Sequence, residues 1–326
     1  MEAHRHRGFI VNVPDDYNDS FKGGRRSPTG GRRKKRELLN GGIRQSARQM
    51  LNSACFTPRD EALLETLLGI GLLSRHQIQR LFFKPDGHPF TTAERIRKLY
   101  ERHVLNYTAD LMDRMRAAGL EPCHVYSLGS VGEEILAIRR GITRNALGLS
   151  ERYDIYRGNL LLMHDLQVSE VYVRAKLAAR QMRGDIAWHN EQAAAIRSQA
   201  GEELVRPDSA LSLQPKGITT AYFVEMDRGS THWPNKIDFY EHARLSGDGW
   251  QQQFRCREFP AVLAVIPPRL LNKVAQAIRQ EAHSVRFWVK TWSAFLQTGF
   301  FQGWLDVAAD RQADLIPKGD LVHARQ

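Results

Sequence analysis

The sequence is poor in cysteine and lacks long apolar runs. Its 326 residues include three cysteines, Cys55, Cys123 and Cys256, whose odd number and wide spacing exclude a disulfide framework and a zinc-finger pattern. The longest apolar segments, 67–73 and 261–266, are far shorter than the roughly 18 residues needed to span a bilayer. The first ten residues also lack an apolar signal-peptide core. We therefore expect a cytoplasmic protein with no membrane partner.

Several catalytic signatures are also missing. The sequence has no GxxxxGK[ST] loop, which excludes a P-loop ATPase, and its histidines show no HExxH spacing, which argues against a zinc enzyme. The run Gly129-Ser130-Val131-Gly132 does not have the spacing of a GxSxG nucleophile.

Positive charge is in excess. The 47 Lys and Arg residues outnumber the 36 Asp and Glu residues, giving a net charge of +11, which favours a polyanionic partner such as duplex DNA. Residues 1–56 hold twelve of the basic and five of the acidic residues, among many glycines. We expect this segment to be a flexible basic arm that contacts phosphates, with a merely solvated tail as the alternative. Its densest basic run is Arg32, Arg33, Lys34, Lys35 and Arg36.

Residues 57–145 show the pattern of a small helical domain. Helix N-cap signals precede three segments of helical periodicity, at Thr57, at Ser74, and at Thr91 or Thr92. Two strand-like runs follow, 104–107 and 124–128, and predict a hairpin. The order of two helices, a basic third helix and a hairpin is typical of a winged helix-turn-helix.

The third helix is the expected DNA-binding element. Its apolar stripe includes Ile96 and Leu99, and its other residues include four cations, Arg95, Arg97, Lys98 and Arg102. One face would pack on the domain while the other meets phosphates and base edges. The alternative is a plain three-helix packing unit with solvated cations.

The second half of the chain predicts an α/β sandwich. Residues 146–163 are expected to be a linker, and a domain over 164–292 then begins with a long amphipathic helix, 164–183. Strands and helices alternate after it, which predicts an α/β fold, or α+β for the chain as a whole. The strands are expected at 186–188, 204–213, 219–226, 261–266 and 285–289, and the helices at 235–245 and 269–282. Residues 293–326 are expected to form a loosely packed or partly disordered tail.

Acidic residues stand at the ends of the predicted strands. Glu225 and Asp227 are two residues apart, so in a strand they point to the same face. Asp208, on a neighbouring strand, would lie within a few ångströms of Glu225. Paired carboxylates are ligands for Mg²⁺, and a metal there would activate water against a phosphodiester.

The spacing of these acids resembles a known pattern. Pro207-Asp208 followed by Glu225-x-Asp227 is similar to the PD-(D/E)xK nuclease motif. The run 225–230, with Lys236, Tyr240 and the winged-helix front half, resembles the replication-relaxation family of plasmid and mobile-element proteins. This resemblance spans about residues 57–270. It implies a DNA-binding accessory protein of replication, relaxation or mobilisation, with replication or mobilisation proteins as partners.

One departure from the nuclease motif leaves two functions open. The motif places lysine where this sequence has Asp227, so Lys236 on the following helix would have to supply the amine. If Lys236 lies near Asp208 and Glu225, the resemblance implies an Mg²⁺-dependent endonuclease or nickase. Asp208 and Glu225 would then hold the metal and Lys236 would orient the attacking water. Asp227 or Glu191 would assist, with Glu191 matching an earlier acidic residue of some nucleases. If it does not, the domain binds DNA without cutting it. The structural alternatives are that Asp208 and Asp227 cap turns, Glu191 begins a helix and Lys236 lies on the surface.

Overall fold

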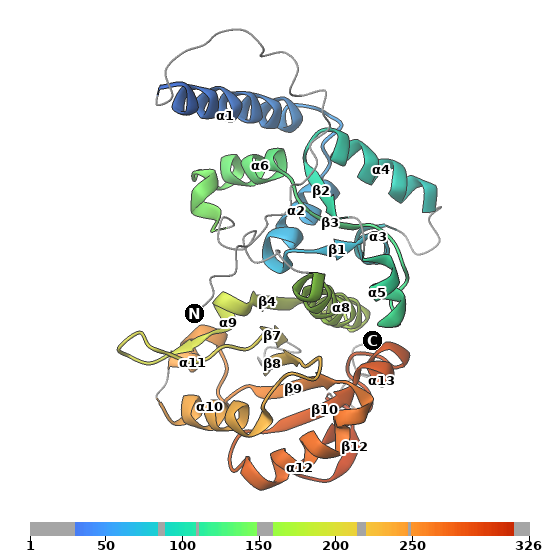
Figure 1. The fold of residues 1–326 in the computed structure, drawn as a ribbon, viewed down its shortest axis with the longest axis vertical. Coiled ribbons are helices and arrows are strands. Elements are labelled where there is room, and N and C mark those ends of the chain that lie inside the picture. The colour runs from blue at the N-terminus through green and yellow to red at the C-terminus, as the bar shows by residue number, and fades with distance from the viewer. Residues whose placement is uncertain are drawn as a thin grey trace, which may run out of the picture.

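The structure is a computed structural model that describes residues 30–83, 89–108, 111–148, 159–213, 220–246 and 249–315. Figure 1 shows helices and a small sheet in the N-terminal half, a larger sheet in the C-terminal half, and α8 between the two. The fold is mixed, with helices and a mostly antiparallel large sheet, and is α+β overall. Within the described residues, no helix is both long and apolar enough to cross a membrane.

The N-terminal half joins short helices to a three-stranded antiparallel sheet of order β1-β3-β2. Its elements are α2 (Pro58–Ile70), β1 (Leu73–Ser74), α3 (Arg75–Phe82), α4 (Pro89–Glu101), β2 (Leu105–Thr108), α5 (Met112–Ala117), β3 (Val125–Leu128), α6 (Ser130–Arg140) and the 3₁₀ turn η3 (Arg144–Leu147). Thr57 and Ser74 form capping boxes, so both predicted N-caps are confirmed. The predicted pairing of β2 with β3 is also confirmed, but helix α5 lies between these strands where a loop was expected. The predicted start of α4 is wrong by three or four residues, since the helix begins at Pro89 and both Thr91 and Thr92 lie inside it.

Helix α1 (Gly30–Leu51) occupies part of the segment that the sequence predicts to be a flexible arm. The prediction is wrong for this part, and residues 1–29 lie outside the described residues. Ala47 and Met50 are buried, and Ile43 packs against the same core. This helical spacing lets α1 bury one face against the N-terminal domain, including α6, and that burial outweighs the low helix propensity of glycine.

The C-terminal half is built on a seven-stranded sheet of order β12-β11-β10-β9-β8-β7-β4, in which β8, β9 and β10 run parallel and the other pairs are antiparallel. Its elements are α8 (Asn159–Gln181), β4 (Ile186–Asn190), α9 (Glu191–Ala194), β5 (Ile196–Arg197), β6 (Glu203–Val205), β7 (Ser209–Leu213), β8 (Thr220–Met226), α10 (Trp233–Leu245), α11 (Gly249–Phe254), β9 (Ala261–Ile266), η5 (Pro268–Leu270), α12 (Leu271–Glu281), β10 (Phe287–Thr291), α13 (Trp292–Gln297), β11 (Trp304–Asp306) and β12 (Arg311–Ala313). The strand predicted over 204–213 is two strands, because Pro207 has no N–H for the ladder.

The segment after residue 292 is not a loose tail. It forms α13 and two further strands of the large sheet, and Phe295, Phe300 and Trp304 are almost completely buried. The prediction is therefore wrong for residues 293–315, while residues 316–326 lie outside the described part. The reason is apolar burial, because these aromatic side chains complete one face of the sheet.

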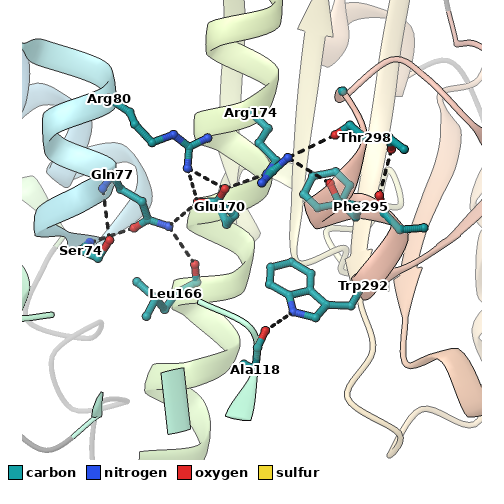
Figure 2. A network of polar contacts seen from close by, with 12 residues as sticks. Ser74, Gln77, Arg80, Ala118, Leu166, Glu170, Arg174, Trp292, Phe295 and Thr298 are labelled. Atoms are coloured by element: carbon teal, nitrogen blue, oxygen red, sulfur yellow. Dashed lines mark hydrogen bonds and ion pairs between the residues drawn. The ribbon is translucent and has the colours of Figure 1, made fainter. Parts of the chain in front are cut away.

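Helix α8 joins the two halves. One hydrophobic cluster includes Leu64 and Ile78 from the first half, Val171 of α8, and Trp288 from the second. Figure 2 shows polar contacts that run from α3 through Glu170 and Arg174 of α8 to the region of α13. Of the predicted linker 146–163, residues 149–158 lie outside the described residues, and α8 already begins at Asn159.

Candidate functional site

The antiparallel pairing of β7 with β8 brings Asp208 and Glu225 to the same end of the sheet. Ser209 is paired with Val224, so Asp208, which directly precedes β7, faces Glu225 in the same register. The Oδ2 atom of Asp208 accepts a hydrogen bond from the backbone N–H of Met226 at 2.6 Å. The two acids thus lie close together, as expected. The Asp208 carboxylate also binds β8 through the backbone N–H of Met226.

Lys236 reaches this pair from α10. Its Nζ lies 2.9 Å from Oε1 of Glu225 and donates to the backbone carbonyl of Arg206 at 3.0 Å. Tyr240, about one turn further along α10, donates its hydroxyl to the same Oε1. Lys236 is 21% exposed and Glu225 7% exposed at their side chains. Lys236 therefore lies beside the carboxylate of Glu225, where the nuclease motif would need an amine.

Burial and charge act against each other at the Glu225–Lys236 pair. Burial raises the pKa of Glu225 to about 7, although the charge of Lys236 opposes the shift. Burial lowers the pKa of Lys236, but the carboxylate of Glu225 outweighs this effect, and the net shift is upward. Lys236 therefore stays cationic next to a carboxyl group that is expensive to ionise.

A further residue of this site, His164 of α8, was not predicted from the sequence. Its Nε2 lies 3.2 Å from Oδ2 of Asp208, and its Nδ1 lies 3.4 Å from Oδ1 of Asp165. Burial lowers the pKa of His164, but the two carboxylates outweigh this effect and raise it to about 10. No sequence motif marks His164, because its place beside Asp208 depends on how α8 crosses the sheet.

Asp227 serves the turn that leads from β8 into α10. Its Oδ1 accepts from the backbone N–H groups of Gly229, Ser230 and Thr231 at 2.6, 3.2 and 3.3 Å. Its Oδ2 accepts from Nε1 of Trp233 at 3.0 Å. The turn-capping alternative is confirmed, and both oxygens of Asp227 are engaged there rather than with the Glu225–Lys236 pair.

Glu191 lies at the rim of the site. It begins α9, with Asn190 as the N-cap, which confirms the helix-start alternative. Its exposed carboxylate lies 3.6 Å from Nη1 of Arg206, the residue whose carbonyl holds Lys236. Glu191 thus contacts the site through Arg206.

Two carboxylates at this end of the sheet, Asp208 and Glu225, are the candidate ligands for a divalent cation. Among the described residues, no group of three or more His, Cys, Asp or Glu side chains is arranged to hold a metal. Asp208 and Glu225 supply two carboxylates from adjacent strands, and Mg²⁺ commonly takes one or two carboxylates together with waters and substrate phosphates.

The four cations expected on the third helix lie in different surroundings. Arg95 pairs with Asp60 of α2, and its Nε lies 2.9 Å from Oδ1, so it points into the domain.

Arg97 and Lys98 are exposed and pair with Glu94, and Arg97 also pairs with Glu101. Arg102 lies against the sulfur of Met50, 3.1 Å away. The side chains of residues 32–36 are outside the described part.

A comparison with protein families gives one match. The family model described as replication-relaxation matches residues 64–255, more than half of the chain. No similar protein was found among curated proteins or among solved structures. The matched segment runs from α2 to α11 and includes Asp208, Glu225 and Lys236. The chain therefore belongs to the replication-relaxation family.

Proposed function

We propose that this protein is a DNA-binding accessory protein of plasmid or mobile-element replication, relaxation or mobilisation. The observation that carries the proposal is the order of α2, β1, α3, α4, β2, α5 and β3, with the three strands in one antiparallel sheet. This order resembles that of a winged helix with a short helix, α5, inserted between the two wing strands. In such a fold α4 would enter the major groove and the β2–β3 pair would touch the DNA backbone. Membership of the replication-relaxation family supports the biological process.

The exposed cations of α4 support this role. Within the described residues, Arg97 and Lys98 form ion pairs only with glutamates of their own helix, and such surface pairs are weak enough for phosphates to replace the glutamates. Arg95 has a different role, because its hydrogen bond to Asp60 holds α4 against α2. We therefore assign DNA contact to Arg97 and Lys98 and a packing role to Arg95.

A salt titration of duplex binding tests the proposal. We expect the double variant Arg97→Ala/Lys98→Ala to bind labelled duplex DNA more weakly in fluorescence anisotropy. The slope of log K against log salt should fall by about 2, because two phosphate contacts are lost. Lys273→Ala, which removes an exposed charge from α12, is the control. Equal affinity and slope in the double variant and wild type would remove α4 as the DNA-binding element.

A second candidate function is an Mg²⁺-dependent endonuclease or nickase, which the contact between Lys236 and Glu225 favours. Asp208 and Glu225 would hold the cation, and Lys236 would orient the attacking water. His164, cationic beside Asp208, would attract the scissile phosphate. Bound Mg²⁺ would supply an activated water and offset charge on the leaving oxygen.

A nicking assay separates the two candidates. Supercoiled plasmid from the protein's own replicon is incubated with Mg²⁺ or Mn²⁺ and with wild type, Glu225→Ala or Lys236→Met, and circular dichroism checks the fold. Nicking by wild type that both substitutions abolish would support the endonuclease. Retained DNA binding without nicking by wild type would leave a DNA-binding protein on a nuclease-like scaffold. Glu202→Ala, at an exposed position, is the control for loss of negative charge.

A further inference from the structure

A second concave surface lies in the N-terminal half, away from Asp208 and Glu225. A cavity of about 300 Å³ opens between α4, the β2–β3 pair and the start of α3. Its walls consist chiefly of three tyrosines, one histidine and two arginines: Tyr100, Tyr107, Tyr126, His124, Arg75 and Arg97. Of these residues, the proposed function uses only Arg97.

The backbone brings the aromatic residues together from three elements. Tyr107 of β2 is directly opposite Tyr126 of β3 in the antiparallel register, and His124 immediately precedes β3. Tyr100 comes from the last part of α4, three residues after Arg97, so both lie on one side of the helix. The cavity therefore lies where the proposed recognition helix meets the proposed wing.

The rings form a continuous aromatic wall around an exposed tyrosine. Tyr100 and Tyr107 pack edge to face with centroids 4.9 Å apart, and Tyr107 and His124 do the same at 5.5 Å. Tyr107 nevertheless remains 41% exposed. Edge-to-face contacts fix the orientation of this ring, while its open surface is available to a flat partner.

The charges around the wall favour an anionic ligand. Burial raises the pKa of Tyr126, and the positive charge of Arg75 opposes the shift, so the guanidinium acts on the inner part of the cavity. Arg97 lies at the edge, and no aspartate or glutamate is among the described residues that line the cavity. Aromatic faces combined with arginine are the usual surroundings of an unstacked nucleobase and its phosphate.

We propose that this cavity holds one unpaired DNA base, with Tyr107 as the stacking platform and Arg75 near the adjoining phosphate. A base inside a duplex has both faces covered, so only an unpaired or extruded base can stack on a side chain. The cavity is at the small end of ligand sites, which limits it to about one nucleotide. This inference rests on the proposed DNA-binding function and adds a preference for DNA with a single-stranded element.

The test compares two labelled DNA probes, one without and one with a single-stranded element. One is a perfect duplex, and the other is the same duplex with a short single-stranded gap carrying 2-aminopurine. Full-length wild type, Tyr107→Ala and Tyr107→Phe are titrated at a fixed low salt concentration, with anisotropy for affinity and 2-aminopurine fluorescence for stacking. Phe239→Ala, which removes an exposed aromatic ring from α10, is the matched control.

We expect wild type to bind the gapped probe about 10-fold more tightly than the duplex and to quench 2-aminopurine. Tyr107→Ala should lose this preference and the quenching while its duplex affinity stays within about two-fold, and Tyr107→Phe and Phe239→Ala should keep both. Equal binding of both probes by wild type, or a preference that Tyr107→Ala retains, would overturn the inference but leave DNA binding intact. Failure of wild type to bind either probe would overturn the proposed DNA-binding function itself.

Discussion

Arg80 of α3 and Glu170 of α8 form an ion pair, in which one arginine nitrogen, Nη1, lies 2.7 and 3.0 Å from the two carboxylate oxygens. Gln77 and Arg174 donate to the same carboxylate at 3.1 and 2.8 Å. Arg174 also donates to the backbone carbonyl of Phe295 at 3.1 Å (Figure 2). The buried carboxylate of Glu170 therefore connects α3 of the proposed DNA-binding half, through Arg174, to α13 of the C-terminal half.

The first prediction concerns this link. Glu170→Ala removes the carboxylate to which Gln77, Arg80 and Arg174 all donate. Their N–H groups then lose this hydrogen-bond acceptor. Loss of one member of a buried ion pair typically costs about 3–5 kcal/mol, and we expect the lower end because Arg80 and Arg174 can reach solvent. Urea denaturation of wild type, Glu170→Ala and the exposed control Glu202→Ala measures the loss. A loss no larger than that of the control would show that the carboxylate does not hold the halves together.

The second prediction separates the turn from the site. Asp227→Ala deprives three backbone N–H groups and the indole of Trp233 of their acceptor. We expect the free energy of unfolding to fall by about 2–3 kcal/mol, because a cap is lost and buried donors remain unsatisfied. Asp238→Ala, at an exposed position of α10, should have little effect. Equal stability of the two variants would argue against this role of Asp227.

Local patterns predicted many of the elements but not every boundary. Thr57 and Ser74 cap helices because Asp60 and Gln77 complete their capping boxes within three residues, and such short-range signals are visible in the sequence. The tail prediction failed because the burial of Trp304 and Phe295 depends on a sheet formed by distant strands. Long-range packing of this kind leaves no periodic signal over a short segment.

The acids of the candidate site and Lys236 as its candidate amine were predictable from the sequence, but His164 and the contacts that both cations make were not. The proximity of Asp208 and Glu225 follows from pairing two neighbouring strands. The contact of Lys236 with Glu225 requires the angle at which α10 returns over the sheet, and that of His164 with Asp208 requires the path of α8. Arg95 was grouped with the DNA-binding cations because helical spacing alone does not reveal Asp60 on the neighbouring helix.

The third prediction uses two glycines with opposite surroundings. A Cβ at Gly132 of α6 would lie 2.2 Å from the backbone oxygen of Val104, whereas a Cβ at Gly69 of α2 would have no described atom outside its own helix backbone and chain neighbours within 4 Å. Gly132→Ala must push α6 away from the start of β2, and we expect a loss of about 2 kcal/mol. Gly69→Ala should gain about 0.5 kcal/mol from helix propensity. Thermal denaturation of both variants checks the two signs, and a neutral Gly132→Ala would contradict the close approach.

The last prediction concerns pH and the buried Lys290 of β10. Its ammonium group donates to the carbonyls of Gly299 and Gln302 at 3.1 and 2.5 Å, and the residue is 2% exposed. Burial, together with the charge of Arg174, lowers its pKa to about 8. In the unfolded chain the lysine pKa is about 10.4, so between pH 8 and pH 10 the unfolded state binds more protons than the folded state.

Rising pH in this window therefore favours the folded state of wild type relative to Lys290→Met, which has no proton to lose. The unfolding free energy of wild type minus that of Lys290→Met should therefore rise with pH, by at most about 1.4 kcal/mol per pH unit. Urea denaturation at pH 7.5, 9 and 10 measures it, with Lys273→Met on the exposed face of α12 as the control. A difference that stays constant or shrinks as pH rises would mean that Lys290 does not lose its proton in the folded protein within this window. The carbonyls of Gly299 and Gln302 would then compensate for its burial.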